Sequence, residues 1–142
     1  MALVRQILDS KGHDIWYVSP GDSVLSAITI MAEKSIGALL VMEDEKLAGI
    51  LSERDYARKV VLKGRSSENT PVSEIMTAEV VSATPDQTVQ ECMTLMTEKR
   101  IRHLPVIHGG RVDGILSIGD LVKSIIAEQQ FQIEQLENYI TA

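Results

Sequence analysis

The chain contains one seven-residue stretch twice, as Gly49-Ile-Leu-Ser-Glu-Arg-Asp55 and as Gly114-Ile-Leu-Ser-Ile-Gly-Asp120. Aligning Pro20 with Pro85 brings the two stretches into register without a gap. Further identical pairs in this register are Val24 and Val89, Met31 and Met96, Ile36 and Ile101, Leu39 and Leu104, and Val41 and Val106. Identity that continues in one register from the proline to the aspartate indicates an internal duplication.

Outward from the repeated stretch, each copy has the same predicted order of elements, β-α-β-β-α. A short β-rich run, at 15–18 in one copy and 80–82 in the other, ends before the proline. An amphipathic helix follows, with apolar residues such as Val24, Ile28 and Met31 at positions i, i+4 and i+7. Asp22-Ser23 and the segment Thr84 to Thr88 offer N-caps for the two helices. The remaining predicted elements are strands at 38–42, 47–51, 104–107 and 112–116, and closing helices that begin at Ser52 and Ser117. The predicted fold class is therefore mixed α/β (α+β).

The domain organisation follows from the duplication. We expect repeat 1 at residues 1–65, repeat 2 at 66–127 and a C-terminal helical extension at 128–142, with Lys63 to Ser73 as a Gly-, Ser- and Pro-containing linker. A unit of this size has a marginal core by itself. The two sheets are therefore expected to pack face to face with pseudo-twofold symmetry, leaving two related clefts.

The repeated stretch has the residue types of a nucleotide site. A glycine permits close approach of a ligand to the backbone, and a serine with the free N–H groups of a first helical turn suits phosphate. The aspartate three residues later can accept hydrogen bonds from both hydroxyls of a ribose. However, Ser-x-x-Asp is also nearly a capping box, which needs no ligand. From the residues alone both interpretations stand.

The chain resembles the cystathionine β-synthase (CBS) domain pair, or Bateman module, from about Val4 to Ile126. The resemblance rests on the double repeat, on Ile101-Arg-His-Leu-Pro-Val106 and on both Gly-Ile-Leu-Ser-x-x-Asp stretches. It implies binding of an adenine nucleotide, namely AMP, ADP, ATP, NAD(H) or S-adenosylmethionine. It also implies that Asp55 and Asp120 hold ribose and that Ser52 and Ser117 face phosphate. The residues that the resemblance implies near the adenine base are Thr77, Ala78 and Val80.

The two implied sites differ in charge. Arg102 and His103 stand where an apolar strand begins, at a place where the family often has phosphate-facing residues. Pro105 is the proline that is usual in the family. The matching positions in copy one are Gly37, Ala38 and Leu40, while copy one has Arg54 where copy two has Gly119. The site of Ser117 and Asp120 is thus the better equipped for a multiply charged phosphate. The longer stretch Asp9 to Ile15, with His13 and Asp14, leaves room for a larger ligand such as a dinucleotide.

Composition argues against several other functions. The net charge of -6 does not favour nucleic acid, and an aromatic content of 4% gives few stacking surfaces. The longest apolar run, Ile36 to Met42, is too short to cross a membrane, and nothing at the N-terminus has the pattern of a secretory signal. We therefore expect no nucleic-acid or membrane partner, and a cytoplasmic location.

Catalysis is not expected either. The chain is too short for a (β/α)₈ barrel and has no phosphate-binding loop motif. Cys92 falls on an amphipathic helix, which favours a core thiol. The three histidines lack the spacing of a metal site. Neither a catalytic residue nor a metal is therefore predicted.

The C-terminal stretch predicts a helix with an apolar face. Ile126, Ile133 and Ile140 follow one another at heptad spacing, and Phe131 and Tyr139 offer further anchors. CBS pairs usually dimerise, so we expect a homodimer that uses this helix. The sequence thus predicts a regulatory adenine-nucleotide sensor acting on an unknown partner protein. The alternative is a dimeric scaffold that binds no ligand.

Overall fold

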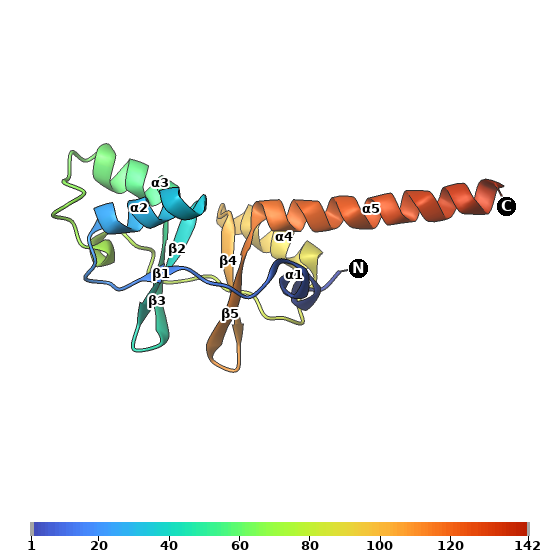
Figure 1. Ribbon diagram of the computed structural model, residues 1–142, viewed down its shortest axis with the longest axis horizontal. Helices are drawn as coiled ribbons and strands as arrows, with labels where there is room; N and C mark the ends of the chain where they lie inside the picture. The colour runs from blue at the N-terminus through green and yellow to red at the C-terminus, as the bar shows by residue number, and fades with distance from the viewer. Residues whose placement is uncertain (1, 142) are drawn as a thin grey trace. The chain divides into compact units, whose positions relative to one another are not determined.

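The computed structural model describes residues 2–141 and divides into two compact units (Figure 1). One unit comprises residues 15–81, and the other comprises residues 2–14 together with residues 82–141. The mixed α/β class is confirmed. The packing differs from the order of the chain in two places. Residues 2–14 fold with the second copy, and residues 66–81, which were predicted in repeat 2, fold with the first. The repeat boundaries at 65 and 127 stay a prediction.

The unit of residues 15–81 is built on a three-stranded sheet of order β1-β2-β3. Strand β1 (Tyr17–Val18) is parallel to β2 (Ala38–Glu43), which is antiparallel to β3 (Lys46–Ser52). Helix α2 (Val24–Lys34) connects β1 to β2 and buries Val24, Ala27 and Met31. The unit is completed by α3 (Glu53–Tyr56), a π-helical turn η1 (Ala57–Val61) and a 3₁₀ turn η2 (Val72–Glu74).

The other unit contains a hairpin of β4 (His103–His108) and β5 (Arg111–Ser117). Ala83 lies beside Val106 in a single parallel bridge, where the first copy has β1. The unit also contains α1 (Val4–Lys11), α4 (Val89–Lys99) and the long α5 (Ile118–Thr141). Figure 1 shows α5 extending well beyond the other elements of its unit. The β-rich run predicted at 80–82 is therefore not a strand, since a single bridge at Ala83 replaces it.

Local sequence explains where the two equivalent helices begin and end. Ser23 and Thr88, both among the predicted N-caps, accept hydrogen bonds from the backbone N–H groups of Ser26 and Glu91 at 3.1 Å. Each helix ends at a residue in the left-handed region, Ser35 (φ 54°) or Arg100 (φ 55°). The matching caps show that duplication has kept the helix boundaries.

The core is apolar, as the patterning predicted. Cys92 is completely buried on α4 at the position of Ala27 on α2, which confirms it as a core thiol. Burial raises the pKa of the Cys92 thiol to about 11, and the neighbouring Glu91 carboxylate adds to the shift. A thiol with such a pKa stays protonated near neutrality.

The segment predicted as a linker, Lys63 to Ser73, is attached to the start of α2. The N–H groups of Val24 and Leu25 donate to the carbonyls of Thr70 and Ser67, both at 2.9 Å. Thr70 itself is buried. These bonds satisfy the open N–H groups of the first helical turn, so the segment acts as part of the unit instead of as a free connection.

The two leading segments occupy equivalent places, each on the sheet of the other copy. Leu8 of α1 covers Gly114 on β5, and Met76, which follows η2, covers Gly49 on β3. A Cβ at Gly114 would lie 2.7 Å from Leu8 Cδ2, and one at Gly49 would lie 2.6 Å from Met76 Sδ. The glycine of the repeated stretch thus leaves room for this packing, and its role in the approach of a ligand stays a prediction.

Within residues 2–141, no helix is both long enough and apolar enough to cross a bilayer.

Candidate functional site

Ser52 and Asp55 lie where β3 passes into α3 and form a capping box. The Ser52 N–H donates to Asp55 Oδ2 at 2.9 Å, and the Asp55 N–H donates to Ser52 Oγ at 3.1 Å. Lys59, one turn further on, places its ammonium 3.1 Å from Asp55 Oδ1 and also donates to the Ile75 carbonyl at 3.0 Å. The Asp55 side chain is only 16% exposed. The carboxylate is thus mostly buried and paired with a cation.

Ser117 and Asp120 form the equivalent arrangement at the start of α5. The Ser117 N–H donates to Asp120 Oδ2 at 2.8 Å, and the Asp120 N–H donates to Ser117 Oγ at 3.2 Å. Here the cation is Lys11, the last residue of α1, whose ammonium lies 2.6 Å from Asp120 Oδ2 and 2.9 Å from the Ile115 carbonyl. Both aspartates therefore have a lysine partner, although the lysines come from different parts of the chain.

The pKa of Asp120 is lowered below its ordinary value. Burial alone would raise this pKa, but the hydrogen bond and charge of Lys11 and the backbone N–H of Ser117 outweigh it. Asp120 is accordingly a carboxylate near neutral pH. As a carboxylate it can only accept hydrogen bonds, which is the property needed to hold two hydroxyl groups.

The capping interpretation of the motif is confirmed by these bonds in both copies. In each copy, capping uses backbone N–H groups, the serine Oγ and the Oδ2 atom of the aspartate. Capping therefore does not by itself exclude a ligand. At Asp120 the bonds to Lys11 and Ser117 both fall on Oδ2, and no hydrogen bond described for residues 2–141 uses Oδ1.

In the unit of residues 15–81, the structure brings several predicted residues to the motif. Ala38 lies opposite Ser52 in the β2–β3 register, and the Gly37 carbonyl accepts the Glu53 N–H at 3.1 Å. Thr77 pairs with Ile50 through two backbone hydrogen bonds of 2.9 and 3.0 Å. Thr77, one of the residues implied near the base, thus lies beside the motif of copy one. The remaining predicted residues of this unit are Arg54 and Ala78, which are exposed, and Val80, which is half-buried.

In the other unit, His103 lies opposite Ser117, and the Arg102 carbonyl accepts the Ile118 N–H at 2.9 Å. Pro105 is buried, and its carbonyl accepts the Ala83 N–H at 2.9 Å. Arg102 is exposed and His103 half-buried. His103 is therefore paired with the motif in the strand register, while Arg102 precedes β4 and is joined to the start of α5 only by its backbone carbonyl. The phosphate-facing roles of both residues stay a prediction.

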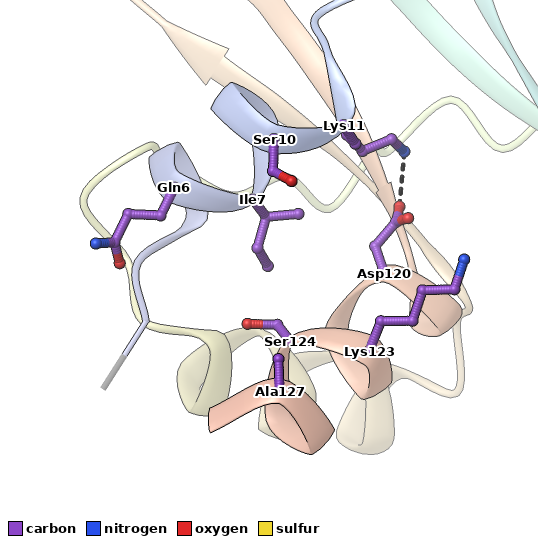
Figure 2. Close-up of a pocket in the computed structure, with 8 residues that line it drawn as sticks. All are labelled: Gln6, Ile7, Ser10, Lys11, Asp120, Lys123, Ser124 and Ala127. Atoms are coloured by element: carbon purple, nitrogen blue, oxygen red, sulfur yellow. Dashed lines mark hydrogen bonds and ion pairs between the residues drawn. The ribbon is translucent and has the colours of Figure 1, made fainter. Parts of the chain in front are cut away.

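A pocket of about 300 Å³ opens between α1 and α5 beside Asp120 (Figure 2). Among the predicted site residues only Asp120 lines it. The two lysines at this pocket, Lys11 and Lys123, are not among the residues predicted from the sequence. The likeness between Val4-Arg-Gln-Ile-Leu8 and Val72-Ser-Glu-Ile-Met76 was the available signal, but it did not reveal which sheet each segment would join.

His13, in the longer stretch of copy one, also folds onto the second copy. Its Nδ1 lies 2.8 Å from the Asp113 carbonyl and 3.3 Å from Asp113 Oδ1. The bond to the Asp113 carbonyl raises the pKa of His13; desolvation opposes this rise, and the carboxylates of Asp113 and Asp9 add to it. The stretch is therefore tied to β5 at this point.

The fold and the duplicated motif define a tandem CBS module, and sequence comparison agrees. The family model described as CBS domain matches residues 4–62 and 72–127. The chain belongs to the CBS domain family. Such modules are generally regulatory and non-catalytic, and some bind adenosine-containing ligands.

Relatives resemble the chain over most of its length. The mitochondrial CBS domain-containing protein CBSX3 of Arabidopsis thaliana is 39% identical, over 96% of this chain and 71% of that protein. A signal-transduction protein with CBS domains from Burkholderia ambifaria is 57% identical, with a TM-score of 0.88 and coverage of 90% and 96%.

Two further structures bear on ligands and assembly. The CBS domain pair of protein MJ0100, solved with 5′-methylthioadenosine and S-adenosyl-L-methionine, is 25% identical with a TM-score of 0.80, covering 90% of this chain and 98% of that chain. The hexameric CBS-CP12 protein from bloom-forming cyanobacteria is 27% identical with a TM-score of 0.77, covering 85% of this chain and 66% of that chain.

The Lys11–Asp120 pair predicts a pH-dependent contribution to stability. Because the folded-state pKa of Asp120 is lowered, the stabilisation is present above the ordinary aspartate pKa and disappears as pH falls through the lowered value. Lys11→Gln should therefore lower the free energy of unfolding at pH 7, on the order of 1 kcal/mol. The difference from wild type should shrink toward pH 3 in urea unfolding followed by circular dichroism.

Lys46→Gln is the matched control, since Lys46 lies exposed at the start of β3. Its effect should be small and nearly constant with pH. An effect of Lys11→Gln that is equally constant would contradict the assigned pair.

Proposed function

We propose that this CBS pair is a regulatory module that binds an adenine nucleotide (AMP, ADP, ATP or NAD(H)) and has no catalytic activity of its own. The observation that carries the proposal is the pair of mostly buried carboxylates, Asp55 and Asp120, each placed by a serine cap at a strand-to-helix junction. The complex of the related MJ0100 pair with adenosine-containing ligands supports the same ligand class.

The proposed roles follow the two units. In residues 15–81, Asp55 accepts the ribose hydroxyls and Ser52 faces phosphate. Ala38 with the Thr77 segment borders the base. Arg54 supplies positive charge there. In the other unit, the corresponding roles fall on Asp120, Ser117, Arg102 and His103.

Each proposed ribose acceptor forms an ion pair with a lysine in the structure. Ribose hydroxyls that reach Asp55 or Asp120 compete with Lys59 or Lys11 for the carboxylate oxygens. A displaced lysine remains close enough to pair with a phosphate, because its side chain is long and flexible. Nucleotides are thereby favoured over uncharged nucleosides.

Regulation would act by population shift. A nucleotide changes the balance between two conformations only by as much as it binds one better than the other. We also propose that the module acts on a partner protein and that its location is cytoplasmic.

A second candidate function, a ligand-independent dimeric scaffold, is favoured by the exposed face of α5. Ile126, Ile133 and Ile140 are exposed at heptad spacing, and Phe131, Leu136 and Tyr139 are exposed as well. Exposed apolar residues in such a row are costly in water and typical of an interface. We propose homodimerisation through this face, which is compatible with either function.

Asp120→Asn and Asp55→Asn test the sensor proposal. Each substitution removes a charged acceptor while keeping size and capping ability, so each should weaken AMP or ATP binding about tenfold in isothermal titration. Asp44→Asn, in the exposed β2–β3 turn, should leave the affinity unchanged. Equal affinity of all three variants and wild type would refute the ribose roles.

Ile133→Asp tests the dimer proposal. A charge in the centre of the exposed face should shift the mass measured by light scattering from dimer toward monomer. Gln132→Asp adds the same charge at the adjacent position, which is also exposed, and should leave the mass unchanged. A wild-type monomer, or a dimer that tolerates Ile133→Asp, would be evidence against this interface.

A further inference from the structure

One row of exposed side chains on α5 has the spacing of a coiled coil. Its members alternate four and three positions apart along the helix, and all but one of them are apolar. The single polar member, Gln129, lies near the middle of the row. This seam comprises Val122, Ile126, Gln129, Ile133, Leu136 and Ile140, all of which are exposed.

Helix α5 rests on its own unit through a different face. Leu121 is buried, and Ser124 and Ile125 are half-buried. Val122 follows Leu121 by one residue, so it is turned about 100° away round the helix axis. Residues 129–141 are all exposed, on the part of α5 that extends past the other elements of its unit (Figure 1). No element within residues 2–141 therefore covers the seam, and a row of this kind is typical of an interface.

Charge is unevenly distributed along α5. Lys123, near the start of the helix, is its only basic residue, whereas the later part contains Glu128, Glu134 and Glu137. Within residues 2–141, neither Lys123 nor Glu137 forms an ion pair. Each of these two directly follows a residue of the seam, so both lie along the same edge of it. A helix that covers the seam brings its own charges to this edge.

The edge charges distinguish the two orientations in which a second α5 could cover the seam. In a parallel, in-register pair, Lys123 would lie about 21 Å along the axis from the partner subunit's Glu137. In an antiparallel pair with Val122 opposite Ile140 and Ile126 opposite Leu136, the edge residues Lys123 and Glu137 meet at both ends of the pair. The antiparallel orientation also opposes the two helix dipoles. Charge complementarity therefore favours it.

We propose that α5 forms an antiparallel two-helix coiled coil with α5 of a second subunit, with an ion pair between Lys123 and the partner subunit's Glu137 at each end. This proposal rests on the homodimer proposed above and adds its orientation and register. A second copy of the chain fits because α5 itself supplies both the cation and the carboxylate. The same face is used by both subunits, so the assembly closes as a dimer.

Reversal of the edge charges tests the orientation on the full chain. Lys123→Glu and Glu137→Lys each turn two attractive contacts into two repulsive ones, so each should weaken the dimer about tenfold in sedimentation equilibrium. The double variant restores opposite charges and should return the dissociation constant to within about twofold of wild type. Both positions are exposed, and both new residues are good helix formers, so the fold should be kept.

Glu134→Lys is the matched control for Glu137→Lys. It makes the same charge change less than one turn away, at an exposed position that lies off the seam. It should leave the dissociation constant unchanged. Equal weakening by Glu134→Lys, or a double variant as weak as either single variant, would overturn the proposed ion pair.

Disulfide formation gives an independent measure of the register. In the antiparallel pair, Ile126 faces Leu136, and each lies about 15 Å along the axis from its own counterpart. Ile126→Cys and Leu136→Cys should therefore stay uncrosslinked when each is oxidised alone and should crosslink when mixed. Cys92 does not compete, because it is completely buried and its pKa is raised to about 11.

The outcomes separate this proposal from the ones on which it depends. A wild-type chain that is monomeric would remove the homodimer and the coiled coil together. A dimer in which Ile126→Cys or Leu136→Cys crosslinks with itself would retain the homodimer and refute the antiparallel orientation. Nucleotide affinity is measured separately, so failure of the sensor proposal leaves this one standing.

Discussion

Two contacts, Leu8 on Gly114 and Met76 on Gly49, determine how the rest of the molecule is organised. Each strand has a glycine where an apolar side chain of the other copy's leading segment lies against it. A Cβ at either glycine would meet atoms closer than van der Waals distance. Because small duplicated units have marginal cores, such an exchange lets each unit complete its core with residues from both ends of the duplication.

Because of this exchange, each candidate site contains residues from both copies. Asp120 receives Lys11 from α1, while the Asp55 motif receives the backbone of Thr77 from the segment that leads the second copy. Each motif is thus composed of one copy's cap and the other copy's leading segment. Each carboxylate is already paired with a lysine and already caps the backbone of its helix. A ligand must therefore bind the carboxylate more favourably than the lysine that it displaces. A phosphate that re-pairs with the freed lysine meets this condition, which links the buried aspartates to the positive charge around them.

The sequence predicted most of the secondary structure, because the duplication allowed each pattern to be read twice. The N-caps Ser23 and Thr88, the core position of Cys92 and both strand pairs followed from local patterning. The exchange could not be predicted, because Leu8 and Met76 are simply apolar in sequence and fit either sheet. The pocket and Lys123 were missed for the same reason, since they depend on which helix lies against α5. Capping was one of the two interpretations that the sequence left open for Ser52 and Asp55. Lys59 at i+4 was an available signal for the ion pair of Asp55, whereas the Lys11 partner of Asp120 could not be predicted because α1 is remote in sequence.

A double-mutant cycle between Leu8 and Gly114 tests the exchange most directly. Gly114→Ala should lower the free energy of unfolding in the wild-type background, and Leu8→Ala should remove much of that cost by clearing the methyl groups that the new Cβ would meet. We expect a coupling energy of about 0.5–3 kcal/mol between these two residues and none between Gly114 and Met76. A Gly114→Ala cost that is unchanged by Leu8→Ala, or relieved instead by Met76→Ala, would contradict the account.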